Sequence, residues 1–158
     1  NGNIFKKILI ASGYEFVTES ETFYVFSLKD KKDTGTDPFV TYGKGWSPDE
    51  GAHRWTNSSR SEIQFFEINK NNSKVKISFK LTTLKESTIK ILFNQKELKE
   101  IDLKPGVVTD EMTFTLDNNY GVNTFEIISD TQPVLPGNGD ARLLGTMVLG
   151  LQYKFIKN

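Results

Sequence analysis

The side chains best suited to bind or transform a ligand are concentrated between residues 42 and 56, in the stretch YGKGWSPDEGAHRWT. It contains both tryptophans of the chain and its one histidine, next to an arginine. Aromatic rings offer flat apolar faces to the C–H face of a sugar, while polar side chains can bond its hydroxyl groups. We therefore expect a ligand-binding site that uses Tyr42, Trp46, His53, Asn57 and Arg60.

The same stretch also fits a purely structural role. Tryptophan is highly buried on average, and an arginine beside it can hold a corner of a fold through charge-assisted hydrogen bonds. We expect Arg54 to pair with Asp140 and Trp55 to pack beneath the pair. Removing one partner of such a buried pair typically costs about 3–5 kcal/mol.

Catalysis is the weakest of the three interpretations. A serine triad needs a base beside an activated nucleophile, and His53 is the only imidazole, with no nucleophile-elbow pattern around any serine. Asp49 and Glu50 could act on a glycosidic bond, but adjacent carboxylates in a turn are usually solvated. A hydrolase or esterase activity therefore remains only as an alternative, and we expect no enzyme activity from this chain.

The composition limits the cofactors and partners. With no cysteine, thiolate nucleophiles and Cys-ligated zinc are excluded. The oxygen-rich stretches 117–119 and 137–140 leave structural calcium as an option, and we expect no other cofactor. Twenty basic and twenty acidic residues balance, which argues against nucleic acid as a partner, and no apolar run is long enough to insert into a membrane.

The chain divides into three expected parts. Residues 1–30 predict a helix over 3–13 and a β-hairpin over 14–30, the tail of a preceding domain, and residues 31–38 are polar enough for a linker. Residues 39–158 predict a β-sandwich domain. Its expected strands with alternating apolar residues lie at 74–81, 88–94, 111–116, 122–129 and 146–155, and residues 89–103 predict a strand, a tight turn and a second strand. The fold class is thus all-β, a two-layer antiparallel sandwich with a short N-terminal helix-plus-hairpin appendage.

Three motifs add a family resemblance that covers about residues 39–156. The stretch 45-GWSPDEGAHRWT-56 resembles the GWxxPExxxRWT signature of a β-sandwich domain attached to bacterial glycosyltransferases and other cell-envelope glycan enzymes. The stretch 140-DARLLG-145 resembles its DxRxLG element, and 91-ILFNQKELKEI-101 its strand–turn–strand, with Gln95 where glycine is usual. The resemblance implies a jelly-roll-like sandwich and makes Arg54, Trp55, Asp140 and Arg142 its structural motif.

The resemblance also implies a function. It points to a non-catalytic carbohydrate-binding accessory module of a cell-envelope glycosyltransferase or related glycan-processing protein. The partners would be a glycan or glycan-bearing lipid and the remainder of the parent polypeptide, at the extracytoplasmic face of a bacterial membrane. Because the chain begins with Asn1, we expect it to be part of a longer polypeptide. A structural or docking domain without a ligand of its own remains the main alternative.

Overall fold

The computed structural model describes residues 14–19, 24–28, 39–67 and 73–157, and in these ranges the protein is all-β. The expected helix over 3–13 and the linker over 31–38 lie outside the described residues. The expected N-terminal hairpin is present as β1 (Tyr14–Glu19) and β2 (Tyr24–Leu28), which pair antiparallel. The described ranges contain no helix that is long and apolar enough to cross a membrane.

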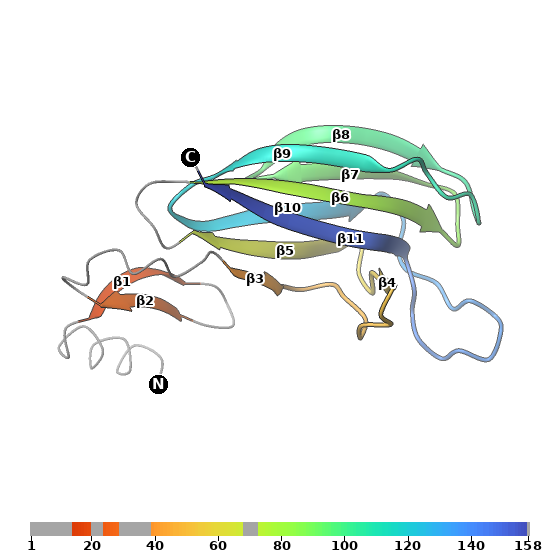
Figure 1. Cartoon of the computed structure of the whole chain (residues 1–158). Coiled ribbons are helices and arrows are strands. Elements are labelled where there is room, and N and C mark those ends of the chain that lie inside the picture. Colours follow the sequence, from red (N-terminus) through yellow and green to blue (C-terminus); the bar gives the residue numbers. More distant parts are fainter. Residues whose placement is uncertain (1–13, 20–23, 29–38, 68–72, 158) are drawn as a thin grey trace.

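Nine further strands form two antiparallel sheets (Figure 1). The five-stranded sheet has the order β3 (Phe39–Tyr42), β5 (Arg60–Glu67), β10 (Gly121–Ser129), β7 (Ser87–Phe93) and β8 (Lys96–Leu103). The four-stranded sheet has the order β4 (His53–Trp55), β11 (Thr146–Lys157), β6 (Ser73–Thr83) and β9 (Met112–Asn118).

The strand pairing is that of a jelly roll. From β4 to β11 the chain pairs its outermost strands first, β4 with β11, then β5 with β10, β6 with β9 and β7 with β8. This is one long antiparallel ribbon, and the pairs β10–β7 and β11–β6 roll it into two facing sheets. Such double-sheet closure is the jelly-roll architecture, so the expected fold class is confirmed.

The core lies between the two sheets and follows from the alternating pattern. Fully buried side chains project inward from both layers, among them Phe65 and Phe125 from one sheet and Ile77, Phe79 and Leu81 from the other. The rings of Phe79 and Phe125 meet edge to face with centroids 5.6 Å apart. Alternation places these residues on one face of each strand, as expected from the sequence.

The expected alternation along 146–155 is wrong in its first half. Thr146 and Val148 are the buried residues there, because a bulge at Gly150 shifts the phase of the strand. Gly150 has φ +58°, and it and Leu151 together stand opposite one residue of β6. After this bulge the expected phase holds, and Leu151 packs against the core. Bulges of this kind bend a strand and redirect its side chains.

Two other features bear on the expectations. The β7–β8 connection is a two-residue turn with Asn94 (φ 49°) and Gln95 (φ 67°), which confirms the expected hairpin tip. The strands β3, β4 and β5 are additional to those expected. The first two span only four and three residues, and β5 contains the adjacent buried pair Phe65 and Phe66, which hides its alternation.

Candidate functional site

A surface pocket of about 250 Å³ lies where the β3–β4 connection meets the middle of β11. Its aromatic residues are Tyr42, from the end of β3, and Trp46, from the connection. Its polar residues come from three places along the chain and are Asp49, His53, Arg54 and Gln152. The pocket therefore combines flat apolar surface with groups that donate and accept hydrogen bonds.

The backbone at Gly45 holds Trp46 in place. Gly45 has φ +86°, and a Cβ atom there would lie 2.6 Å from Ser61 Oγ and 2.8 Å from Ser61 Cα. Its carbonyl accepts hydrogen bonds from the Ser61 hydroxyl and the Asn57 amide N–H. Only glycine combines this conformation with such close approach, so the residue fixes the course of the loop.

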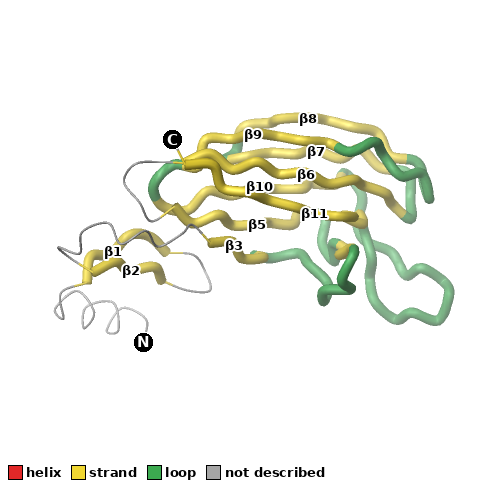
Figure 2. Tube along the Cα trace, in the orientation of Figure 1, coloured by secondary structure: helices red, strands yellow, loops and turns green. Residues whose placement is uncertain are grey.

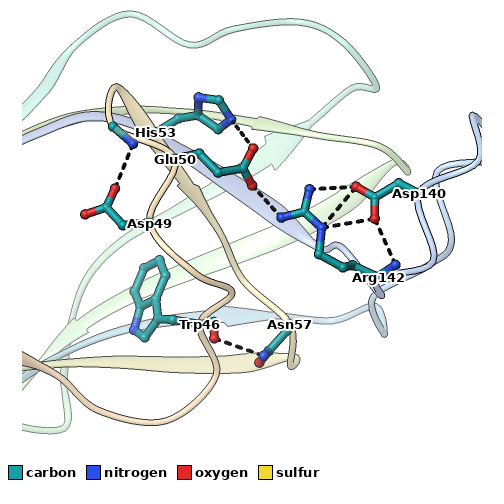
Figure 3. Close-up of polar contacts among 8 residues, drawn as sticks. Trp46, Asp49, Glu50, His53, Asn57, Asp140 and Arg142 are labelled. Carbon is teal, nitrogen blue, oxygen red and sulfur yellow. Dashed lines mark hydrogen bonds and ion pairs between the residues drawn. The ribbon is translucent and has the colours of Figure 1, made fainter.

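Trp46 is half-buried and tied at both its side chain and its backbone. Its indole N–H donates to the Glu62 carbonyl at 2.7 Å, and its own carbonyl accepts from Asn57 Nδ2 at 2.9 Å (Figure 3). The Tyr42 ring meets the indole at 83°, with centroids 5.4 Å apart. Since the indole N–H is already bonded, Trp46 can offer a ligand only apolar ring surface.

Arg54 forms the charged side of the pocket. Its Cζ lies 3.8 Å from the centre of the Tyr42 ring, and its Nη2 lies 3.0 Å from Asp49 Oδ2. Its Nε is buried and has no hydrogen-bond partner within the described part of the chain, although the side chain as a whole keeps 18% of its surface exposed. Burial raises the pKa of Tyr42, so its hydroxyl stays neutral and can donate.

Asp49 is held as an ionised acceptor. The Gly51 amide N–H donates to Asp49 Oδ1 at 2.9 Å, and this bond, followed by the one from Arg54, lowers the pKa of Asp49. The side chain is 60% exposed. At neutral pH the pocket thus carries one fixed negative and one fixed positive charge next to each other.

A second charged cluster, here named the clasp, consists of Glu50, His53, Asp140 and Arg142 (Figure 3). Arg142 Nε donates to both Asp140 oxygens at 3.0 Å, and its Nη2 reaches Oδ2 at 2.6 Å. Its Nη1 donates to Glu50 Oε1 at 2.7 Å, and Glu50 Oε2 lies 3.3 Å from His53 Nε2. The clasp joins two loops through the bond between Glu50 and Arg142, which are 92 residues apart in the sequence.

The expected pairing of Arg54 with Asp140 is wrong. Asp140 bonds Arg142 only two residues away, through the backbone amide at 2.9 Å as well as the guanidinium. Such a local contact closes a much shorter loop than a pair with Arg54 would. Arg54 meets Asp49 because the turn at Gly51 folds the carboxylate back toward β4. Trp55 is buried, with 7% of its surface exposed.

The structure brings together three of the five residues expected to bind a ligand. Tyr42, Trp46 and His53 all line the pocket. Asn57 is bonded to the Trp46 carbonyl, and Arg60 is bound to the buried Glu126 through Nε at 2.7 Å. Neither of these two lines the pocket.

Sequence reasoning did not assign Asp49, Arg54 or Gln152 to ligand binding. The proline, acidic residues and glycine of 48-PDEG-51 signal the turn that places Asp49. Gly150 inside an alternating strand is the signal for the bulge before Gln152.

The side chains that line the pocket can be compared with the catalytic alternative. Apart from the Tyr42 phenol, its side chains include no hydroxyl or thiol nucleophile that His53 could activate. No group of three or more metal-binding His, Cys, Asp or Glu side chains occurs within the described ranges. In the oxygen-rich stretch 137–140, the Asp140 carboxylate is occupied by Arg142.

Comparison with known proteins gives structural similarity only. No protein-family model matches the chain, and no curated protein sequence does. A family 35 carbohydrate binding module from Clostridium thermocellum is similar over 74% of this chain and 89% of its own, with 13% identity and a TM-score of 0.37. One from Paenibacillus barcinonensis is similar over 77% and 94%, with 15% identity and a TM-score of 0.36. A family two carbohydrate esterase from Cellvibrio japonicus is similar over 77% of this chain but only 32% of its own, with 13% identity and a TM-score of 0.42. At these identities and TM-scores, the similarity assigns neither a family nor a function.

Proposed function

We propose that residues 39–158 form a non-catalytic carbohydrate-binding module whose ligand occupies the pocket between the β3–β4 connection and β11. One observation carries the proposal. The surfaces of Tyr42 and Trp46 meet the paired charges of Asp49 and Arg54 in a single open pocket. A pyranose ring presents apolar C–H groups and hydroxyl groups side by side, which is the complementary arrangement.

The charges and the volume of the pocket limit the class of sugar that it can bind. The Asp49 carboxylate can accept from two hydroxyl groups and the Arg54 guanidinium can donate to others, while their opposite charges balance. A neutral sugar therefore fits better than a strongly charged one. The pocket holds about 250 Å³, below the roughly 300–1,000 Å³ of sites for drug-sized ligands. It is suited to one sugar ring.

The affinity should be low. A shallow, open pocket buries little area, and association costs translational and rotational freedom that only a few contacts offset. We expect dissociation constants of roughly micromolar to millimolar. Useful binding would then require that the module be attached to a protein that supplies further contacts with the glycan.

The motifs at 45–56 and 140–145 support a proposal for the wider context. We extend the proposal to an accessory module of a bacterial cell-envelope glycosyltransferase or related glycan-processing protein, at the extracytoplasmic face of the membrane. Its partners would be a glycan or glycan-bearing lipid and the parent polypeptide, with residues 1–30 as the tail of a preceding domain and 31–38 as the linker. Locating the full-length gene product and its neighbouring domains tests this context.

Titration calorimetry with a panel of neutral cell-envelope saccharides tests the binding function. Wild-type protein should release heat with at least one saccharide, and Trp46→Ala and Asp49→Asn should each weaken binding about tenfold or more. Asp110→Asn is the matched control, because Asp110 is exposed and lies outside the pocket. Absence of heat with every saccharide would contradict the proposal and support the alternative of a docking domain.

A further inference from the structure

We infer that the binding site continues from the pocket onto Tyr153, so that the ligand is a sugar chain and not a single terminal sugar. The inference rests on the proposed carbohydrate-binding function and adds the length of the ligand. Its basis is the side of the sandwich between β3 and the second half of β11, beside the pocket.

This side of the sandwich is left open by the short strand β4. Within the described residues β4 pairs only with Met147, Val148 and Leu149, whereas β11 continues to Lys157. Figure 2 shows β11 extending well past β4 toward the C-terminus. Beyond Leu149, the residues of β11 therefore have a strand neighbour only on the β6 side.

Tyr153 stands on this open stretch and is unusually exposed for its position. It pairs with the core residue Ile77, and its ring meets the rings of Phe65 and Phe155 edge to face at 6.0 and 6.2 Å. An inward register usually buries a residue, yet 47% of Tyr153 is exposed. One side of the ring thus covers the core, and a large part of the rest is free for contact.

The ring continues the pocket in space. Leu151 lines the pocket, and Tyr153 follows two residues later on the same face of β11, about 6–7 Å along the strand. Burial is the main cause of the raised pKa of Tyr42, and the charge interaction with the Tyr153 phenol is a small further cause. A sugar in the pocket would have its next unit beside Tyr153.

The bulge at Gly150 makes this continuation possible. It restores the inward phase for Leu151, Tyr153 and Phe155 after Val148. If the same sequence ran as a regular strand from Val148, without the bulge, Tyr153 would lie on the outer face of the sheet, away from the open side. The same backbone feature therefore shapes the pocket and aligns the adjoining ring.

Binding as a function of chain length tests the inference. The probes are glucose and N-acetylglucosamine, each with its β-1,4-linked di-, tri- and tetrasaccharides, titrated against the full chain by calorimetry and NMR. In wild-type protein the disaccharide should bind about three- to tenfold more tightly than the monosaccharide, the gain expected from one added ring contact. Tyr153→Ala should remove this gain and leave the monosaccharide affinity unchanged, while Tyr153→Phe should keep the gain.

Val107→Ala is the matched control, because Val107 is an exposed apolar residue outside the pocket. Dispersion of the Phe65 and Phe155 side-chain signals reports whether Tyr153→Ala keeps its fold. Equal affinity for all chain lengths in wild-type protein, or an unchanged gain in Tyr153→Ala, would overturn the extended site while the pocket stands. Failure of every probe to bind would overturn the proposed function itself, and the inference with it.

Discussion

Arg54 and Arg142 are each paired with an aspartate on neighbouring loops, but their guanidinium groups are used very differently. Arg142 donates from Nε, Nη1 and Nη2 to Asp140 and Glu50. Among the residues that the structure describes, Arg54 forms an ion pair only with Asp49 and its buried Nε has no hydrogen-bond partner, while its guanidinium lies over the Tyr42 ring. Every nitrogen of the Arg142 guanidinium thus donates to a carboxylate, whereas within the described residues only Nη2 of Arg54 is engaged.

The difference separates structural from binding chemistry within one corner of the fold. A bidentate arginine with all its nitrogens engaged fixes two loops relative to each other. An arginine with unused donors beside aromatic rings is suited to a ligand that brings its own acceptors. On this basis the clasp holds the site, and the pocket around Arg54 is the site.

The largest effect expected is a loss of folding stability when Gly45, beneath the pocket, is replaced. Gly45→Ala should destabilise the protein by about 3 kcal/mol or more, because the new Cβ would collide with Ser61 in a left-handed conformation. Gly51→Ala is the matched substitution, with φ +79° but nothing within 4 Å of the added atom. It should cost only about 1–2 kcal/mol. Urea denaturation measures both, and equal losses would show that the close packing at Gly45 is not what holds the loop.

The next largest effect is a difference in saccharide affinity between variants of the two arginines. Arg54→Ala should weaken saccharide binding about tenfold or more, because it removes the donors that face the ligand and frees the Tyr42 ring. Arg142→Ala should change affinity by about threefold at most. Calorimetry on the pair of variants decides, and a greater loss in Arg142→Ala would reverse the assignment of site and support.

A smaller effect is expected on the stability of the clasp. Arg142 keeps 40% of its side-chain surface exposed, and solvent screens such an ion pair. Arg142→Ala should lower the melting temperature by only about 2–4 °C. Differential scanning calorimetry gives the value, with Arg142→Lys as the control that retains charge but not the bidentate geometry. A fall of well over 10 °C would mean that the clasp supports the whole sandwich.

The smallest effect is expected on the pKa values of Asp140 and Asp49. The bonds from the Arg142 side chain and then its backbone lower the pKa of Asp140 from its ordinary value of 3.8 to about 2. A lowered pKa in the folded state contributes stability that is complete above pH 3.8 and is lost as the pH falls toward 2. Carboxyl-carbon NMR should show this midpoint in wild-type protein.

The same titration distinguishes the two arginines. Arg142→Ala should move the Asp140 midpoint back up toward 3.8 and leave that of Asp49 in place. Arg54→Ala should raise the Asp49 midpoint only in part, since the Gly51 N–H bond is the larger cause of its lowered pKa. Coupled shifts of both aspartates in either variant would contradict the separation of clasp and pocket.

The two-layer fold could be predicted from the sequence more accurately than the side-chain contacts of the site. Alternation at Ile77, Phe79 and Leu81 predicts the inward face directly, because one buried face imposes a period of two. Alternation fails at Gly150, where a single extra residue shifts the phase. The partner of Arg54 was not predictable, since the sequence does not show that the turn at Gly51 brings Asp49 to it in place of the expected Asp140.

The sequence predicted only those pocket residues that lie near one another in the chain. Tyr42, Trp46 and His53 are grouped by their nearness in the chain, and the structure keeps them together. Gln152 comes from about 100 residues further along, and only the pairing of β11 with β4 brings it there. Asn57 directly follows this stretch in the chain, but it is bonded to the Trp46 carbonyl and does not line the pocket.

The most direct test of the carbohydrate-binding pocket is a two-dimensional NMR titration of the full chain with the tightest-binding saccharide of the panel. Resonances of Tyr42, the Trp46 indole, Arg54 and Gln152 should move together with one saturating curve, while those of Asp140 and Arg142 stay nearly fixed. Absence of shifts at saturating saccharide, or shifts confined to residues outside the pocket, would contradict the account.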